Sequence, residues 1–235
     1  MPQLLPFRHR AHEVSRVEAF SDVVFGFALT LIVVSLEVPR TYAELVNEMR
    51  GFIGFAICFA TLTWVWHEHY RFFRRYSLQD EVTIVLNTTL LFLVLFYIYP
   101  LKFMFELVTR RIRGIGAENG PQLFLIYGLG FAGIFAVFAL IHLHAYRKRV
   151  QLGLNEVEVH DTIGMMVMYL THVAIAVLSI VVAYIVDPRQ IGLAGWSYFL
   201  LGPSSAAVGY WRGTRRARIA EQMLQRNPEL ATANG

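Results

Sequence analysis

The sequence has little charge and almost no cysteine. Charged residues make up 16% of its 235 residues, whereas hydrophobic residues make up 56%, and the mean hydropathy is +0.47. A soluble domain of this length does not need so much apolar surface, so these values indicate a polytopic membrane protein. Cys58 is the single cysteine, which excludes an intrachain disulfide. The formal net charge is +4, and the basic residues that produce it lie in the predicted loops and tail, where membrane topology accounts for them. We therefore expect no nucleic-acid partner.

Apolar residues gather in six long segments, each long enough to cross a bilayer as a helix of about 18 or more residues. We therefore predict an all-α fold, with a single six-helix transmembrane domain over residues 1–235 that is embedded in a lipid bilayer. A short N-terminus and a basic C-terminal tail flank the spans. The predicted spans are 19–38, 51–68, 82–106, 122–146, 162–186 and 191–211.

The basic residues predict how the spans are oriented. If both termini are cytoplasmic, the 21 Lys and Arg residues divide into fourteen on the inner side and seven on the outer side. Cytoplasmic loops of membrane proteins carry an excess of Lys and Arg, so this division favours cytoplasmic termini. The cluster of Arg110, Arg111 and Arg113 falls on the outer side and argues in the opposite direction.

Asp22 is the unusual residue of the first span, because it is the one charge between positions 19 and 36. A carboxylate in a bilayer segment costs about 2.5–3.5 kcal/mol on insertion scales, so it usually faces protein or water and marks a site. An interfacial Asp22 that merely reaches water is the simpler interpretation.

A helical projection at about 100° per residue divides the first span into two faces. One face is an apolar stripe that contains Phe27, Leu31 and Val34 and is interrupted by a single hydroxyl, that of Thr30. The polar pair Ser21 and Asp22 falls on the far side and needs hydrogen-bond partners on a neighbouring helix. Periodicity alone favours ordinary helix packing for the stripe.

The end of the second span offers partners for this polar pair. Trp64 and His67 are predicted to lie on the same inner side of the membrane as the start of the first span, so we expect them to bond Ser21 and Asp22. His67 and the glutamate after it resemble the start of a zinc-protease motif, but the second histidine of that motif is replaced by Arg71. We therefore predict no metal site there.

These residues together resemble the signature of the transmembrane protein 175 family, which comprises organellar and prokaryotic cation channels. The resemblance begins at Arg16-x-x-x-Phe20-Ser21-Asp22, continues through Thr30 and Glu37-Val38-Pro39, and ends at Trp64 and His67. The six-span length extends the resemblance over the whole chain.

The resemblance implies a potassium-preferring channel in a prokaryotic plasma membrane, not an enzyme, with K⁺ and other monovalent cations as permeant ions and no cofactor. It implies a homotetramer in which the first helix of each subunit lines the pore and the polar signature packs behind it. Phe27 then corresponds to an apolar constriction that is usually Ile or Leu, with Leu31 and Val34 as further apolar layers. Thr30 corresponds to a hydroxyl layer linked to potassium preference.

Three other interpretations are weighed against this channel. Val208-Gly209-Tyr210 resembles part of the Thr-Val-Gly-Tyr-Gly potassium filter, but Trp211 follows where glycine is required, so no such filter is predicted. A secondary transporter would use polar residues at the membrane midplane, and a haem or metal redox protein would use the histidines. The residues available for those two roles are Asn87, Thr88, Thr89, His142, His144 and His172.

Overall fold

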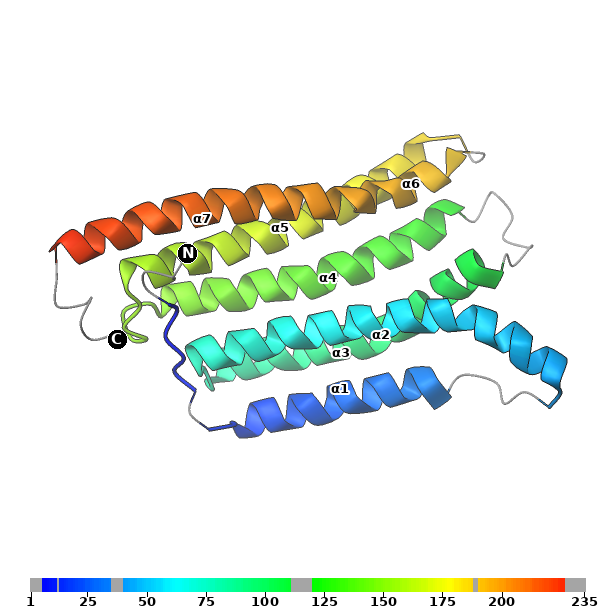
Figure 1. The fold of residues 1–235 in the computed structure, drawn as a ribbon, viewed down its shortest axis with the longest axis horizontal. Coiled ribbons are helices and arrows are strands. Elements are labelled where there is room, and N and C mark those ends of the chain that lie inside the picture. Colours follow the sequence, from blue (N-terminus) through cyan, green and yellow to red (C-terminus); the bar gives the residue numbers. More distant parts are fainter. Residues whose placement is uncertain (1–5, 12, 35–39, 111–119, 188–189, 227–235) are drawn as a thin grey trace.

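The computed structural model describes residues 6–11, 13–34, 40–110, 120–187 and 190–226, and within these ranges all regular structure is helical. The helices lie side by side along one long axis, with α1 at one edge and α7 at the other (Figure 1). In chain order they are α1 (Arg16–Val34), α2 (Tyr42–Tyr76), α3 (Glu81–Arg110), α4 (Gly120–Arg147), α5 (Glu156–Ile185), α6 (Gly192–Trp196), the 3-10 helix η3 (Ser197–Leu200) and α7 (Leu201–Arg226).

The predicted spans correspond to these helices with one exception. Each of the first five spans coincides with a long helix, although residues 35–38 of the first span lie outside the described ranges, as do Glu37, Val38 and Pro39 of the signature. The sixth span, 191–211, is divided among α6, η3 and the start of α7. Its glycines weaken a continuous helix, and Pro203 lacks a backbone N–H, so it fits best in the first turn of a new helix.

Three of the described helices are long and apolar enough to cross a membrane, judged by length and composition. These spans are Glu81–Leu101 in α3, Gly120–Arg147 in α4 and Glu156–Ile185 in α5. The other three predicted spans, and hence the six-span topology, remain predictions.

Helix α4 lies at the centre of the bundle, between α3 and α5. Two of its glycines allow this close packing. A Cβ atom at Gly130 would lie 2.3 Å from the ring of Tyr97 on α3, and one at Gly128 would lie 2.5 Å from the side chain of Ile180 on α5. By contrast, α1 packs against α2 and α3 at the edge of the subunit, so one side of α1 is left uncovered.

Asp80 caps the start of α3 and ties it to the end of α4. Its Oδ1 atom accepts a hydrogen bond from the Thr83 backbone at 2.8 Å, and its Oδ2 atom lies 2.9 Å from His144 Nε2 and 2.5 Å from Lys148 Nζ. Burial alone would raise the pKa of this carboxyl, but the hydrogen bonds from Lys148, His144 and Thr83 hold the pKa well below its usual range. Because folding lowers this pKa, the charged form of Asp80 stabilises the fold above the unfolded pKa of about 4.

We expect Asp80→Asn to lower the melting temperature of the purified protein in a pH-dependent way. Asparagine caps a helix as well as aspartate, so the variant removes the charge and keeps the cap. The loss at neutral pH should be about 1.5–3 kcal/mol, the usual value of hydrogen bonds to a charged group. It should shrink as the pH falls below about 4, because the unfolded chain then binds a proton on Asp80, whereas the folded protein with its lower pKa keeps the charge.

Thermal unfolding of both proteins in detergent between about pH 3 and pH 8 measures this difference. Glu81→Gln, a charge removal at the exposed neighbouring residue, is the matched control and should have little effect at any pH. A stability difference for Asp80→Asn that stays constant across the acidic range would show that the charge of Asp80 does not stabilise the fold.

Candidate functional site

Helix α1 presents one face to its own subunit and the opposite face to the outside. Phe27 is 65% exposed and Leu31 is 47% exposed, whereas Phe25 and Ile32 are each 2% exposed. We call the exposed face the α1 stripe, which consists of Phe20, Val23, Phe27, Thr30 and Leu31. Large apolar side chains on one continuous surface indicate a face that another molecule or the membrane covers. The side chain of Val34 lies outside what the structure describes.

A buried chain of hydrogen bonds attaches the opposite face of α1 to α2 and α3. The Ser21 hydroxyl donates to the carbonyl of Val17 at 2.8 Å, so it can only accept the second bond, which comes from Asn87 Nδ2 at 2.9 Å. Asn87 Oδ1 lies 2.9 Å from His69 Nε2, which must then be the donor. We call Ser21, Asn87 and His69 the polar anchor. All three side chains are at least 98% buried.

Asp22 lies at the border between these two faces. It is exposed in the single subunit, and its Oδ1 atom accepts a hydrogen bond from Trp66 Nε1 at 2.8 Å. Ser21 therefore bonds α3 and Asp22 bonds α2, so the two neighbouring polar residues hold α1 against two different helices.

The structure corrects the partners that the sequence predicted for this polar pair. The ring of Trp64 lies 5.2 Å from that of Phe135, on the other side of α2, and exposed His67 lies 6.3 Å from the ring of Tyr70. Trp66 and His69 take the roles expected of Trp64 and His67, because two residues along a helix turn a side chain by about 200°.

The structure also leaves two members of the predicted polar network outside it and adds Asn87, which the prediction missed. Arg16 and Phe20 are exposed, and Phe20 belongs to the α1 stripe. The sequence identifies Asn87 only as a polar residue available to a transporter. Its signal was present in the sequence, because it is the one asparagine of an apolar span and a buried amide needs partners.

Thr30 lies in the α1 stripe beside Phe27. Its hydroxyl donates to the carbonyl of Gly26, one turn back, at 2.9 Å. This is the local bond that serine and threonine commonly form in helices. Because the hydroxyl uses its hydrogen for that bond, the oxygen lone pairs remain available on the exposed face. A cation is bound through lone pairs, so the local bond and a contact with ions are compatible.

The N-terminus of α1 is capped by the side chains of Ser15 and Glu18. The Ser15 hydroxyl accepts a hydrogen bond from the Glu18 backbone at 3.2 Å, and Glu18 Oε1 accepts from the Ser15 backbone at 3.3 Å. This reciprocal pair is a capping box, which satisfies two of the N–H groups that a helix leaves unpaired at its start.

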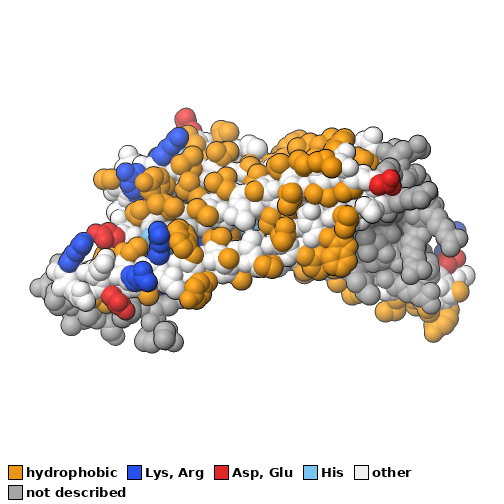
Figure 2. Space-filling model, turned by 90° about the horizontal axis from the view of Figure 1, so that it is seen from above, with side chains coloured by type: hydrophobic (Ala, Val, Ile, Leu, Met, Phe, Trp, Pro, Cys, Tyr) orange, Lys and Arg blue, Asp and Glu red, His pale blue; other side chains and the backbone are white. Residues whose placement is uncertain are grey.

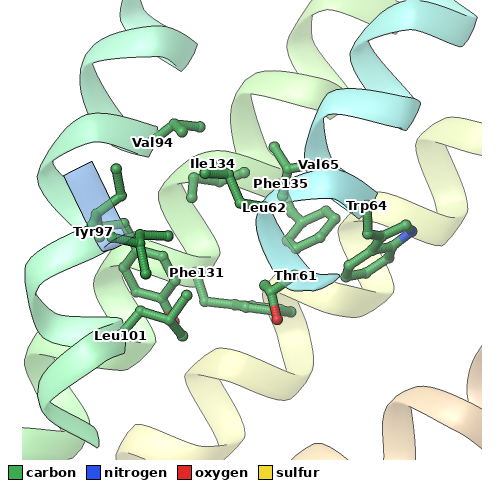
Figure 3. Close-up of a pocket in the computed structure, with 12 residues that line it drawn as sticks. Thr61, Leu62, Trp64, Val65, Val94, Tyr97, Leu101, Phe131, Ile134 and Phe135 are labelled. Carbon is green, nitrogen blue, oxygen red and sulfur yellow. The ribbon is translucent and has the colours of Figure 1, made fainter. Parts of the chain in front are cut away.

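Apolar packing behind α1 is looser near its C-terminal half. A cavity of about 20 Å³ lies among side chains from α1 to α4, including Ile32, Leu62, Val94 and Ile134. Figure 3 shows the rings of Tyr97, Phe131 and Phe135 around it. A small apolar void stays dry and forfeits dispersion contacts. Buried hydrogen bonds thus hold α1 at Ser21, whereas an apolar void lies beside it at the level of Ile32.

The described residues offer no group of three or more His, Cys, Asp or Glu side chains that could hold a metal ion. Two of the histidines weighed for redox chemistry instead have structural bonds. His142 Nδ1 and His172 Nδ1 lie 2.8 Å from the carbonyls of Phe138 and Met168, each one turn back in its own helix.

Comparisons with known proteins show that the part of the chain containing the α1 stripe and the polar anchor matches a known family. The family described as "Endosomal/lysosomal potassium channel TMEM175" matches residues 16–97, which include both features. A potassium channel of Marivirga tractuosa is 36% identical over 233 residues, which cover 92% of this chain and 94% of that relative. The chain belongs to the TMEM175 family. The family resemblance predicted from the sequence is thus confirmed, and the TMEM175 family is one of ion channels, not of enzymes.

Further TMEM175 relatives agree with this result. A potassium channel of Chamaesiphon minutus is 28% identical over 127 residues, covering 51% of this chain and 63% of that protein. A crystal structure of a variant of the potassium channel MtTMEM175, in complex with a nanobody–MBP fusion protein, matches 88% of this chain and 97% of its own with a TM-score of 0.79 and 36% identity. The crystal structure of a TMEM175 homolog from Chamaesiphon minutus has a TM-score of 0.60 at 23% identity, which shows a shared fold.

Proposed function

We propose that this protein is a potassium channel in which four copies of α1 surround the pore. The observation that carries the proposal is the α1 stripe, an exposed apolar face with one hydroxyl on an edge helix that is hydrogen-bonded from behind. If the chain assembles as a homotetramer of six-span subunits, α1 can face the central axis while α2 and α3 support it. Membership of the TMEM175 family, whose relatives include proteins named potassium channels, supports this function.

Permeation would be controlled by the side chains of the α1 stripe. A ring of four Phe27 side chains, with Leu31 and Val34 as further layers, would form an apolar constriction that blocks ions by dewetting. The hydroxyl oxygens of Thr30 lie beside this ring and would replace part of the water that a cation sheds. The narrow part would contain no charged ring, so we expect modest selectivity for K⁺ over Na⁺.

Opening would require the first helices to separate slightly. The polar anchor fixes α1 near Ser21, whereas the cavity behind Ile32 leaves room for small shifts of its other half. We propose that α1 tilts about the polar anchor, which would widen the constriction without breaking the buried hydrogen bonds.

The proposed setting is the plasma membrane of a prokaryote, with both termini on the cytoplasmic side. On the face seen in Figure 2, most Lys and Arg side chains gather at one end of the molecule, and the start of α1 and the end of α7 lie at this end in Figure 1. The positive-inside rule assigns such an end to the cytoplasm.

A current measurement on purified protein in planar bilayers tests the proposed function. A steady current in a potassium and sodium gradient, without any counter-substrate, would support a channel, and its reversal potential gives the preference for K⁺. Flux that appears only when a second solute moves in exchange would instead indicate a secondary transporter.

The selectivity role of Thr30 gives a specific prediction. Thr30→Val keeps the side-chain shape but removes the oxygen, so the permeability ratio of K⁺ to Na⁺ should fall roughly fivefold to tenfold, which corresponds to about 1–1.4 kcal/mol. Thr30→Ser retains the oxygen and should keep most of the preference. The reversal potential in mixed potassium and sodium measures both variants.

Thr61→Val is the matched control for this prediction. Thr61 lies on α2, and its hydroxyl makes the same local bond, to the Ile57 carbonyl at 2.8 Å. The control should leave the reversal potential unchanged. If Thr30→Val also leaves it unchanged in an assembled channel, the hydroxyl of Thr30 is structural and the selectivity assignment is wrong.

A further inference from the structure

The segment before α1 runs across the end of the bundle as an extended strap, which we define as residues 7–11. In Figure 1 it passes from the start of α5, over the ends of the central helices, toward the start of α1. The backbone N–H groups of Arg10 and Ala11 donate to the carbonyl of Arg74 at 3.1 and 3.4 Å, and Arg74 Nη1 donates to the carbonyl of Ala11 at 3.0 Å. The strap is thereby fixed to the C-terminal end of α2.

A buried carboxylate holds the strap to α5. Glu158 has a fully buried side chain, and its Oε2 atom lies 2.7 Å from Arg10 Nη2 and 3.0 Å from Arg8 Nη2. The Arg8 backbone donates to Glu158 Oε1 at 2.9 Å, and the Asn155 backbone donates to Oε2 at 3.1 Å in the capping box of α5. A buried carboxylate with this many donors is stable only while its cations stay in place.

Arg10 joins three parts of the subunit at one point. Besides Glu158, its guanidinium donates to the carbonyls of Leu152 at 2.9 Å, Gly153 at 3.3 Å and Arg75 at 3.3 Å. These carbonyls belong to the loop between α4 and α5 and to the end of α2. The Arg10 side chain is only 17% exposed, whereas that of Arg8 is 58% exposed, so Arg10 is the main attachment.

The strap reaches a part of the subunit that α1 itself does not pack against. Helix α1 packs against α2 and α3, and Glu158 lies on α5, beyond α4. Five peptide steps separate Ala11 from Arg16, so the start of α1 can lie at most about 18 Å from the fixed end of the strap. Movement of this end of α1 away from its own subunit is therefore limited by the strap, which is held both to Arg74 on α2 and, through Arg10, to Glu158 on α5.

We infer that Arg10 and Glu158 are positioning residues for the pore helix, which limit how closely the cytoplasmic ends of the four α1 helices approach the channel axis. The inference rests on the proposed function, since it requires α1 to line the pore. When the ion pair is present, each α1 is held toward the outer helices of its own subunit. Without the pair, the strap keeps only its bonds to Arg74 on α2, and the four helix starts, which precede the polar anchor, shift inward and narrow the cytoplasmic entrance.

The test measures both ion flux and the position of α1 in the assembled protein. Arg10→Ala should reduce potassium flux into proteoliposomes roughly fivefold or more, the scale of a typical coupling between two sites. Glu158→Gln should give a similar loss, and the double variant should lose no more than either one, because both act through the same bond. Arg10→Lys keeps the charge and should restore part of the flux.

A spin label reports the position of α1 independently of conduction. Val14 is 70% exposed and lies two residues before α1, whereas Cys58 is buried, so Val14→Cys can be labelled selectively. Distances between labels in neighbouring subunits should shorten when Arg10→Ala is added. If the unmodified protein carries no potassium, the proposed function fails. A shorter distance between labels in the Arg10→Ala variant would still support the role of the strap in positioning α1.

Arg226→Ala is the matched control, because Arg226 pairs with Glu156 on the same turn of α5 but lies on α7. That pair is 3.5 Å apart and both side chains are at least 60% exposed, so its loss should change neither readout. Flux and distances for Arg10→Ala that equal those of the unmodified channel would overturn the inference. If Arg10→Ala does not assemble, Glu158→Gln with the Val14→Cys label decides it, and unchanged flux and label distances in that variant would equally overturn the inference.

Discussion

Replacing Phe27 by alanine should increase the potassium current through single channels roughly tenfold or more, since each 1.4 kcal/mol removed from a barrier raises a rate about tenfold. Phe27 is 65% exposed in its own subunit, so truncation leaves no cavity in the subunit core. If four Phe27 rings form the constriction, alanine widens it and allows water to remain around the ion. Unitary conductance in planar bilayers measures the effect directly.

Phe92→Ala is a matched control for this prediction, because Phe92 on α3 is also 65% exposed but lies on another helix. It should leave the unitary conductance unchanged. Phe27→Ala channels that assemble less well but conduct normally would contradict the pore position and would indicate that Phe27 packs between subunits.

Replacing Asn87 by leucine should destabilise the protein by roughly 2–6 kcal/mol, because Ser21 and His69 are then buried without their partner at about 1–3 kcal/mol each. These hydrogen bonds join α1 to α2 and α3 at the polar anchor. Their loss should detach α1 from its support and reduce the amount of assembled protein. Thermal unfolding and size-exclusion chromatography of the purified protein measure both effects.

Thr89→Val on the same helix is the control for Asn87→Leu. Thr89 is exposed, and its hydroxyl donates to the carbonyl of Val85, one turn back, at 2.9 Å, so the change should be small. Ser21→Ala combined with Asn87→Leu should cost less than the sum of the single changes, since both remove the same bond. Equal melting temperatures for Asn87→Leu and Thr89→Val would show that the polar anchor does not hold α1.

The sequence was sufficient to predict the helical class, the family and the two faces of α1. Phe27 and Leu31 are exposed and Ser21 is buried, as the helical projection places them on opposite faces, whereas Asp22, which the projection places beside Ser21, is exposed. Such features follow from the 3.6-residue repeat of a helix and from the distribution of apolar residues, which are local properties of the chain. Whether the exposed stripe lines a pore remains a prediction.

Only the tertiary structure decided which residues meet. Trp66, and not Trp64, bonds Asp22, because the rotation of α2 about its own axis depends on packing against several helices at once. Asn87 meets Ser21 from 66 positions away, and Glu158 meets Arg8 from 150 positions away. The sequence determined what each helix presents on its surface, but contacts between distant segments depend on how the helices pack together, which no local pattern records.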